Sequence, residues 1–153
     1  MKEVLKKNLI SLLLVLFCGA FASASPLAVF NYKIFYVPDR GTVVETYFVI
    51  SGRSVVLKDN GEGILKSQVK ITTIFKKGEE IVAFDKKILD SPDMTASSIV
   101  DFLDVERFIL PPGKYDLEIQ IADLYDPVED LKSTTLEIVV PSTPPSGAFI
   151  SDI

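Results

Sequence analysis

Apolar residues recur at every second position over several stretches of this chain. Leu65, Val69, Ile71, Thr73 and Phe75 share one parity, while polar side chains hold most of the alternate positions. Successive side chains of a β-strand point to opposite faces, whereas the side chains of a helix repeat every 3.6 residues. The pattern recurs at positions 44–50 and 115–121. It therefore predicts strands that have one buried and one solvent-facing side.

Turn-forming residues separate these runs. Combinations of Pro, Asp, Asn, Lys and Gly occur at positions 38–41, 59–63, 76–79 and 111–114, and they favour tight turns. They delimit strands near positions 27–37, 42–51, 65–75, 81–89, 105–110, 115–121 and 134–140. Positions 93–104 fit either a loop with one helical turn or an irregular edge segment. The chain is thus predicted to form an all-β, antiparallel β-sandwich of seven or eight strands, of the immunoglobulin-like or fibronectin III-like type.

One tyrosine has a position typical of such sandwiches. Tyr115 follows Pro111, Pro112 and Gly113 near the start of a predicted strand. Sandwich domains often place a tyrosine at a corner of this kind, with its hydroxyl bound to backbone a few residues upstream. We therefore expect the Tyr115 hydroxyl to be buried and hydrogen-bonded.

The first residues resemble an export signal. Lysines at positions 2, 6 and 7 precede an apolar stretch at 9–17, which is shorter than the roughly 20 residues of a membrane-spanning helix. Small residues at Ala22 and Ala24 then predict a signal peptide cleaved between Ala24 and Ser25. The alternatives are a retained membrane anchor and lipid attachment at Cys18, although Phe17 stands where a lipoprotein site has a small residue.

Three segments follow from this organisation: a signal peptide at 1–24, a β-sandwich domain at 25–140, and a Pro- and Ser-rich linker with an apolar tail at 141–153. The tail from Ala148 to Ile153 either folds back as an edge strand or leads into a further domain.

Cleavage would leave 13 basic residues of 16 and 20 acidic residues of 21, because residues 1–24 hold three Lys and one Glu. The resulting net charge of −7 argues against nucleic acid and anionic membrane surfaces as partners.

Residues 25–153 contain no cysteine, histidine or tryptophan. Disulfides are therefore excluded, as are Ser–His triads, Cys–His dyads and zinc sites built on His or Cys. Phosphate-binding and nucleophile-elbow motifs do not occur either. We predict no catalytic residue, no metal ligand and no cofactor.

Three weaker groupings of carboxylates were considered. Asp123, Asp126, Glu129 and Asp130 could gather oxygens for calcium, but their spacing fits no EF-hand loop, and solvated acidic loops are common. The oxygens at positions 59–62 are explained by a hairpin turn. A pair of facing carboxylates for glycoside hydrolysis is not singled out by any spacing.

Aromatic residues are concentrated in the first two predicted strands. Phe30, Tyr32, Phe35 and Tyr36 lie on both parities of one strand, so some of them either pack in the core or form an exposed stripe that contacts a partner or a sugar. These four residues are the candidate partner-binding residues.

Positions 30–36, 44–47, 101–108 and 110–115 resemble the amino-terminal domain of a family of exported, uncharacterised proteins of Bacteroidota, some of which carry a so-called GWxTD domain. The resemblance implies a sandwich fold and a cell-envelope location, and it carries no catalytic residue. This chain has no GWxTD motif, and Ile150 to Ile153 resemble the point where the larger members continue.

Taken together, these features predict a non-catalytic binding or scaffold module of the bacterial envelope or periplasm, without stable membrane insertion after signal cleavage. Its expected partner is an unknown protein, bound through a sheet edge or the aromatic strand, or a further domain of a longer chain. The alternatives are a carbohydrate-binding sandwich and, third, a hydrolase that uses carboxylates alone.

Overall fold

The computed structural model describes residues 25–37, 39–128 and 131–142. The predicted signal peptide with Cys18 and Ala24, the acidic residues Glu129 and Asp130, and the tail at 143–153 lie outside the described residues. Within the described part the chain is almost entirely strand, with a single 3-10 turn, η1 (Gly52–Ser54). The strands are β1 (Ala28–Val37), β2 (Gly41–Ile50), β3 (Lys58–Asp59), β4 (Leu65–Lys66), β5 (Gln68–Lys77), β6 (Glu80–Asp90), β7 (Phe102–Ile109), β8 (Gly113–Asp123) and β9 (Lys132–Val140).

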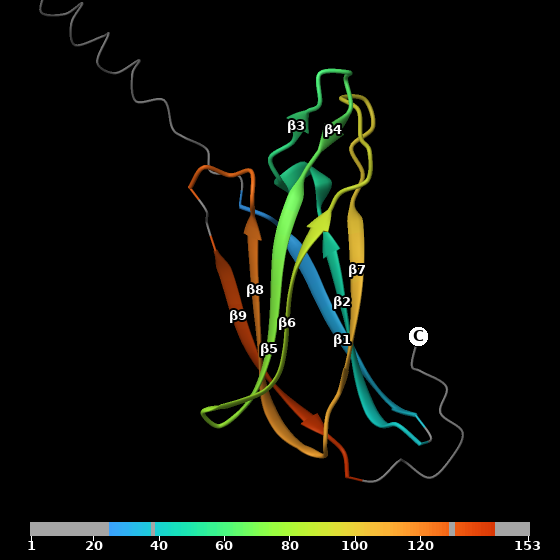
Figure 1. Cartoon of the computed structure of the whole chain (residues 1–153), viewed down its shortest axis with the longest axis vertical. Coiled ribbons are helices and arrows are strands. Elements are labelled where there is room, and N and C mark those ends of the chain that lie inside the picture. Colours follow the sequence, from blue (N-terminus) through green and yellow to red (C-terminus); the bar gives the residue numbers. More distant parts are fainter. Residues whose placement is uncertain (1–24, 38, 129–130, 143–153) are drawn as a thin grey trace, which may run out of the picture.

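Seven long strands build two antiparallel sheets, as the alternation predicts. One sheet has three strands in the order β1-β2-β7, and the other has four in the order β6-β5-β8-β9. The short strands β3 and β4 pair with each other beside them. In Figure 1, β1 passes behind β5 and β6, so the two sheets lie face to face. The prediction of an all-β antiparallel sandwich is therefore confirmed.

The core lies between the sheets and follows the predicted parities. On β5 the inward residues Val69, Ile71 and Phe75 are fully buried, and so is Thr73 between them. The alternate residues of β2 and β8 are buried in the same way: Val44, Thr46, Phe48 and Ile50 on β2, and Tyr115, Leu117, Ile119 and Ile121 on β8. The Phe75 ring joins the two sheets, with its centroid 4.7 Å from that of Phe108 on β7.

The corner before β8 has the expected tyrosine. The Tyr115 hydroxyl donates a 2.6 Å hydrogen bond to the Pro111 carbonyl oxygen, and its side chain is buried. The two partners are four positions apart in the sequence, which is the upstream backbone contact typical of sandwich corners.

The segment between β6 and β7 is an irregular connection that contains β-bridges, so of the two alternatives for positions 93–104 the irregular segment is found and the helical turn is not. Met94 forms a bridge with Leu65, and Thr95 forms one with Ser98. The Leu65 and Met94 amides each donate to the other residue's carbonyl oxygen, at 2.9 and 3.1 Å. The Met94 side chain is fully buried, so it fixes this segment against the core. β7 also begins at Phe102, three residues before the expected start.

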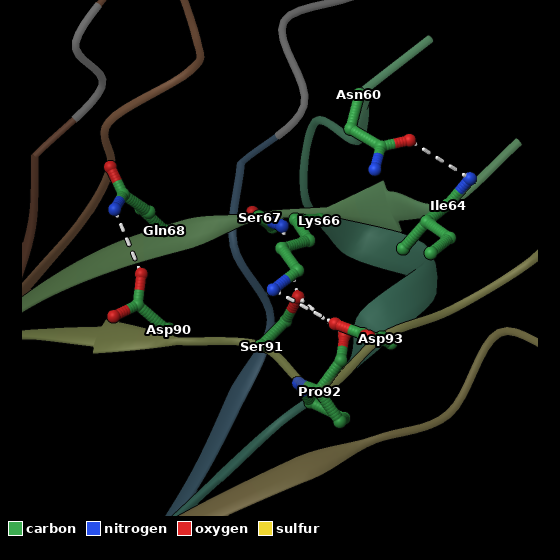
Figure 2. Close-up of polar contacts among 9 residues, drawn as sticks. All are labelled: Asn60, Ile64, Lys66, Ser67, Gln68, Asp90, Ser91, Pro92 and Asp93. Carbon is green, nitrogen blue, oxygen red and sulfur yellow. Dashed lines mark hydrogen bonds and ion pairs between the residues drawn. The ribbon is translucent and has the colours of Figure 1, made fainter. Parts of the chain in front are cut away.

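Polar contacts hold the start of this connection against the first residues of β5, as Figure 2 shows. The Ser67 amide donates to the Ser91 hydroxyl oxygen at 2.9 Å, and that hydroxyl donates to the Pro92 carbonyl oxygen at 3.0 Å. Beside them lie an ion pair between Lys66 and Asp93 at 2.8 Å and a hydrogen bond from Gln68 to Asp90 at 2.8 Å. In the part of the chain that the structure covers, no helix is long and apolar enough to cross a membrane.

Candidate functional site

The face of the three-stranded sheet that points away from the core is the first candidate. Residues directly opposite each other in an antiparallel pair share a face, and the register of β1, β2 and β7 groups its side chains in four rows. We call this surface the outer face. Its rows are Val29, Val49 and Leu103; Asn31, Tyr47 and Val105; Lys33, Glu45 and Arg107; and Phe35, Val43 and Ile109.

Apolar side chains occupy both ends of the outer face. At one end Val29 is 65% exposed, Val49 40% and Leu103 67%, and at the other end Ile109 is 62% exposed. A sheet face that contacts water normally carries polar residues at these alternating positions. Clustered exposed apolar residues mark interaction sites more often than isolated ones do. These exposed side chains make the outer face a candidate contact surface.

A cleft of about 640 Å³ opens at the end of the outer face near the β1–β2 turn. Phe35, Val43 and Ile109, which form one row across the sheet, give it an apolar floor. Its lining is completed by Tyr36, Val37, Arg40, Glu45 and Arg107. This volume lies in the range of small-ligand and side-chain pockets.

Charge on the outer face is concentrated in the row of Lys33, Glu45 and Arg107. The Glu45 carboxylate accepts hydrogen bonds from the Tyr47 hydroxyl and from the Arg107 Nε–H. The Tyr47 hydrogen bond, with a smaller contribution from Arg107, lowers the pKa of the Glu45 carboxyl, and the same bond raises the pKa of Tyr47. Glu45 is thus kept ionised and paired. Lys33, Arg107 and the cleft residue Arg40 together outnumber Glu45. This surface therefore has an excess of positive charge, although the chain as a whole is acidic.

The four aromatic candidates do not form one stripe. Phe30 and Tyr32 point inward: their rings stack with centroids 6.4 Å apart, Phe30 lies 5.2 Å from the Phe48 ring, and both pack against the core. Phe35 and Tyr36 instead line the cleft. The structure therefore brings two of the four together at the candidate site and places the other two, half-buried, against the core.

The candidate residues chosen from the aromatic residues alone do not include most of the outer face. Val29, Val49, Leu103 and Ile109 are aliphatic, and each is an ordinary residue of a strand. A signal was nevertheless present in the sequence of β2, where apolar residues occupy consecutive positions from Tyr47 to Ile50. A strand with apolar residues on both parities is one that is covered on both faces.

At the end of β8 and in the acidic loop after it, carboxylates accept hydrogen bonds from backbone amides. Asp123 is buried, and its two oxygens accept hydrogen bonds from the Val56 amide at 2.6 Å and the Tyr125 amide at 2.8 Å. Asp126, also buried, accepts a hydrogen bond from the Val128 amide at 2.9 Å. Within residues 25–37, 39–128 and 131–142, no three acidic, histidine or cysteine side chains are grouped as metal ligands would be.

The turn between β3 and β4 uses its side-chain oxygens in the same way. Asp59 accepts hydrogen bonds from the Gly61 and Gly63 amides at 2.7 and 3.1 Å. Asn60 accepts from the Glu62 amide at 2.9 Å and from the Ile64 amide at 3.3 Å, the second of which Figure 2 shows. These contacts are side-chain turns of the kind expected for Asx residues.

Two carboxylates of one strand share a cation at the side of the sandwich where β6 and β7 lie. Lys87 of β6 forms ion pairs with Asp104 and, at 3.1 Å, with Glu106, both on β7 of the other sheet. Burial by itself lowers the pKa of Lys87, but the hydrogen bonds from the two carboxylates outweigh it, so the pKa is raised above its usual value. The Glu106 side chain is 4% exposed, which leaves little room for a substrate to reach it.

The outward side of the four-stranded sheet has a different character. Lys70, Thr72, Lys76, Glu118 and Gln120 lie next to one another on β5 and β8, and Lys76 binds Glu118 at 2.6 Å. Exposed apolar residues on this side include Phe84 and Ile88 of β6, the last strand of the sheet. The centre of this sheet is thus mainly polar, with Ile74 among the polar residues, whereas the centre strand of the other sheet carries Val43 and Val49 outward.

Comparison with known proteins gives no match to this chain: no family model, no curated protein and no solved structure is significantly similar to it.

Proposed function

We propose that this protein is a non-catalytic, exported binding module of the bacterial cell envelope, and that it contacts a protein partner through the outer face of its three-stranded sheet. One observation carries the proposal: Val29, Val49 and Leu103 form an exposed apolar row at one end of that face, and Ile109 is exposed at the other end, on a sheet whose opposite side packs against the core. Covering these rows with a partner removes apolar area from water, which is the main driving force of protein association.

The shape and charge of the surface support a protein rather than a sugar as the ligand. Carbohydrate-binding sandwiches offer aromatic rings in a row, because rings stack on sugar faces. Here the exposed aromatic residues Tyr36 and Phe84 belong to different sheets, and the outer face is chiefly aliphatic. Aliphatic and aromatic residues with an arginine rim are typical of protein interfaces.

Export is the second part of the proposal. Its support is the charged start, the apolar stretch and the small residues before Ser25, together with the resemblance of the sandwich segments to exported proteins of Bacteroidota. The strand order of three plus four is also the kind found in immunoglobulin-like modules, which frequently serve as binding or spacer domains outside the cytoplasm.

The proposal is tested by placing a photo-crosslinking amino acid at single positions of the full-length chain in its own host. Leu103 on the outer face and Phe84 on the other sheet are both 67% exposed, so they are a matched pair. We expect a discrete adduct of higher mass from Leu103 and none from Phe84.

A further variant separates binding from folding. Val49 lies beside Leu103 in the same row and is exposed, so Val49→Asp should abolish the Leu103 adduct and leave the midpoint of urea unfolding unchanged. Equal adducts at Leu103 and Phe84, or no adduct at Leu103, would contradict the proposed surface. Binding to a glycan that is lost in Tyr36→Ala would favour the carbohydrate alternative instead.

A further inference from the structure

The cleft at the β1–β2 end of the outer face lies next to the last described residues of the chain. A second, smaller cavity is lined by Ser142 together with Tyr36, Arg40 and Ile109. These three residues also line the cleft. The two hollows therefore adjoin, and the chain leaves the sandwich after β9 at the entrance to the cleft. Figure 1 shows the end of β9 and the β1–β2 turn at the same end of the molecule.

The residues that follow Ser142 can reach the whole cleft. Five residues, at positions 143–147, separate Ser142 from Ala148, and an extended chain spans about 3.3–3.6 Å per residue, so the linker covers up to about 17 Å. Two prolines favour an extended linker conformation with a low entropy cost on ordering. No part of the sandwich has to move for the tail to arrive.

The chemistry of the tail complements that of the cleft. Phe149 and Ile150 are apolar, like the floor formed by Phe35, Val43 and Ile109. Asp152 is the single charged residue of positions 141–153. It has the opposite sign to Arg40 and to Arg107, whose side chain is 70% exposed while its Nε–H binds Glu45.

We infer that the segment from Ala148 to Ile153 of the same molecule docks in the cleft lined by Phe35, Val43 and Ile109. This inference rests on the proposed function, since it treats the outer face as a binding surface and names the occupant of one end of it. The apolar row of Val29, Val49 and Leu103 at the other end stays open.

Engineered cysteine pairs test the inference, because residues 25–153 contain no cysteine of their own. The test variant carries Ile150→Cys with Ile109→Cys. The control carries Ile150→Cys with Val139→Cys: Val139 is 54% exposed, and it lies outside the cleft and nearer to the tail along the chain. A disulfide forms only where the two Cα atoms approach within about 7 Å.

In protein purified after export, from which residues 1–24 and Cys18 with them have been removed, we expect the intramolecular disulfide to form at least about tenfold faster in the test pair than in the control pair, the ratio that a docking preference of about 1.4 kcal/mol gives. Asp152→Lys in the test pair should remove most of this difference. Both reduced double variants should unfold at the wild-type urea concentration.

Each other outcome overturns the inference. Equal rates in the two pairs would mean that the tail does not dock in the cleft. Disulfide-linked dimers through position 109 would mean that the tail binds a second copy and not its own cleft. Neither result affects the photo-crosslink at Leu103, which needs the host's partner, whereas the disulfide test uses one purified chain. Failure of the docked tail and failure of the proposed function are therefore distinguishable.

Discussion

At the scale of single residues, the Tyr115 hydroxyl is the clearest example of a polar group with one defined task. It binds the Pro111 carbonyl oxygen from a buried position. Tyr115→Phe keeps the ring in the core and removes only this bond, so we expect a loss of about 1–2 kcal/mol in the free energy of unfolding. Urea unfolding followed by circular dichroism measures it. Tyr36→Phe, at an exposed ring, should change little, and a loss of only a few tenths in Tyr115→Phe would contradict a buried bond.

Tyr115 could be predicted because its signal is local: the turn residues Pro111 to Lys114 immediately precede it. Glu106 could not be predicted. It occupies an inward position of β7, where the alternation demands an apolar residue, and its partner Lys87 comes from the other sheet. The pairing depends on how two sheets stack, which no local pattern in the sequence encodes. The same limit applies to Ile109 and Tyr36, which become neighbours of one cleft only after β1 and β7 are placed on either side of β2.

At the scale of the strand, the alternation in β5 makes a direct prediction. Ile71 is fully buried, and its neighbour Lys70 points outward. Ile71→Asp places an unpaired carboxylate in the core, which costs several kcal/mol of the roughly 5–15 available to a domain, so we expect cooperative unfolding to be lost. Lys70→Asp should be nearly neutral. Thermal melts of the two variants provide the measurement, and similar melts would contradict the assignment of faces.

Alternation predicted the buried side chains well in strands that have one solvent-facing side. It predicted them less completely in strands whose two sides both carry apolar residues. The faces of β5 and β8 followed from parity, since most of the alternate residues are polar. In β1 and β2 apolar residues fill both parities, and parity alone could not separate core residues such as Phe30 from cleft residues such as Phe35. Only the pairing of β1 with β2 and its packing on the other sheet decide between them.

At the scale of the whole molecule, Lys87 joins the two sheets through Asp104 and Glu106. Lys87→Met leaves two largely buried carboxylates without a cation, so we expect a loss of about 3 kcal/mol in the free energy of unfolding. Urea unfolding near neutral pH measures this loss. Because the Lys87 pKa is raised in the folded protein, its contribution is fully present below the usual value of 10.5 and is lost as the pH rises through the folded value.

Two variants serve as controls for this effect. Lys76→Met removes the cation of an ion pair on the outward side of one sheet, and it should cost far less because solvent screens that pair. Adding Glu106→Gln to Lys87→Met should recover part of the lost stability. If the Lys87→Met protein were as stable as the Lys76→Met protein, the ion pairs of Lys87 with Asp104 and Glu106 would contribute no more to stability than the surface pair.

The same three charges also bear on how the protein behaves in a crowded compartment. β6 and β7 are each the last strand of a sheet, so each has a row of backbone groups that could recruit a strand from another molecule and start aggregation. Charged side chains that point inward from such strands make recruitment costly, because an added strand would bury them without water. Lys87, Asp104 and Glu106 thus disfavour strand addition on this flank of the sandwich.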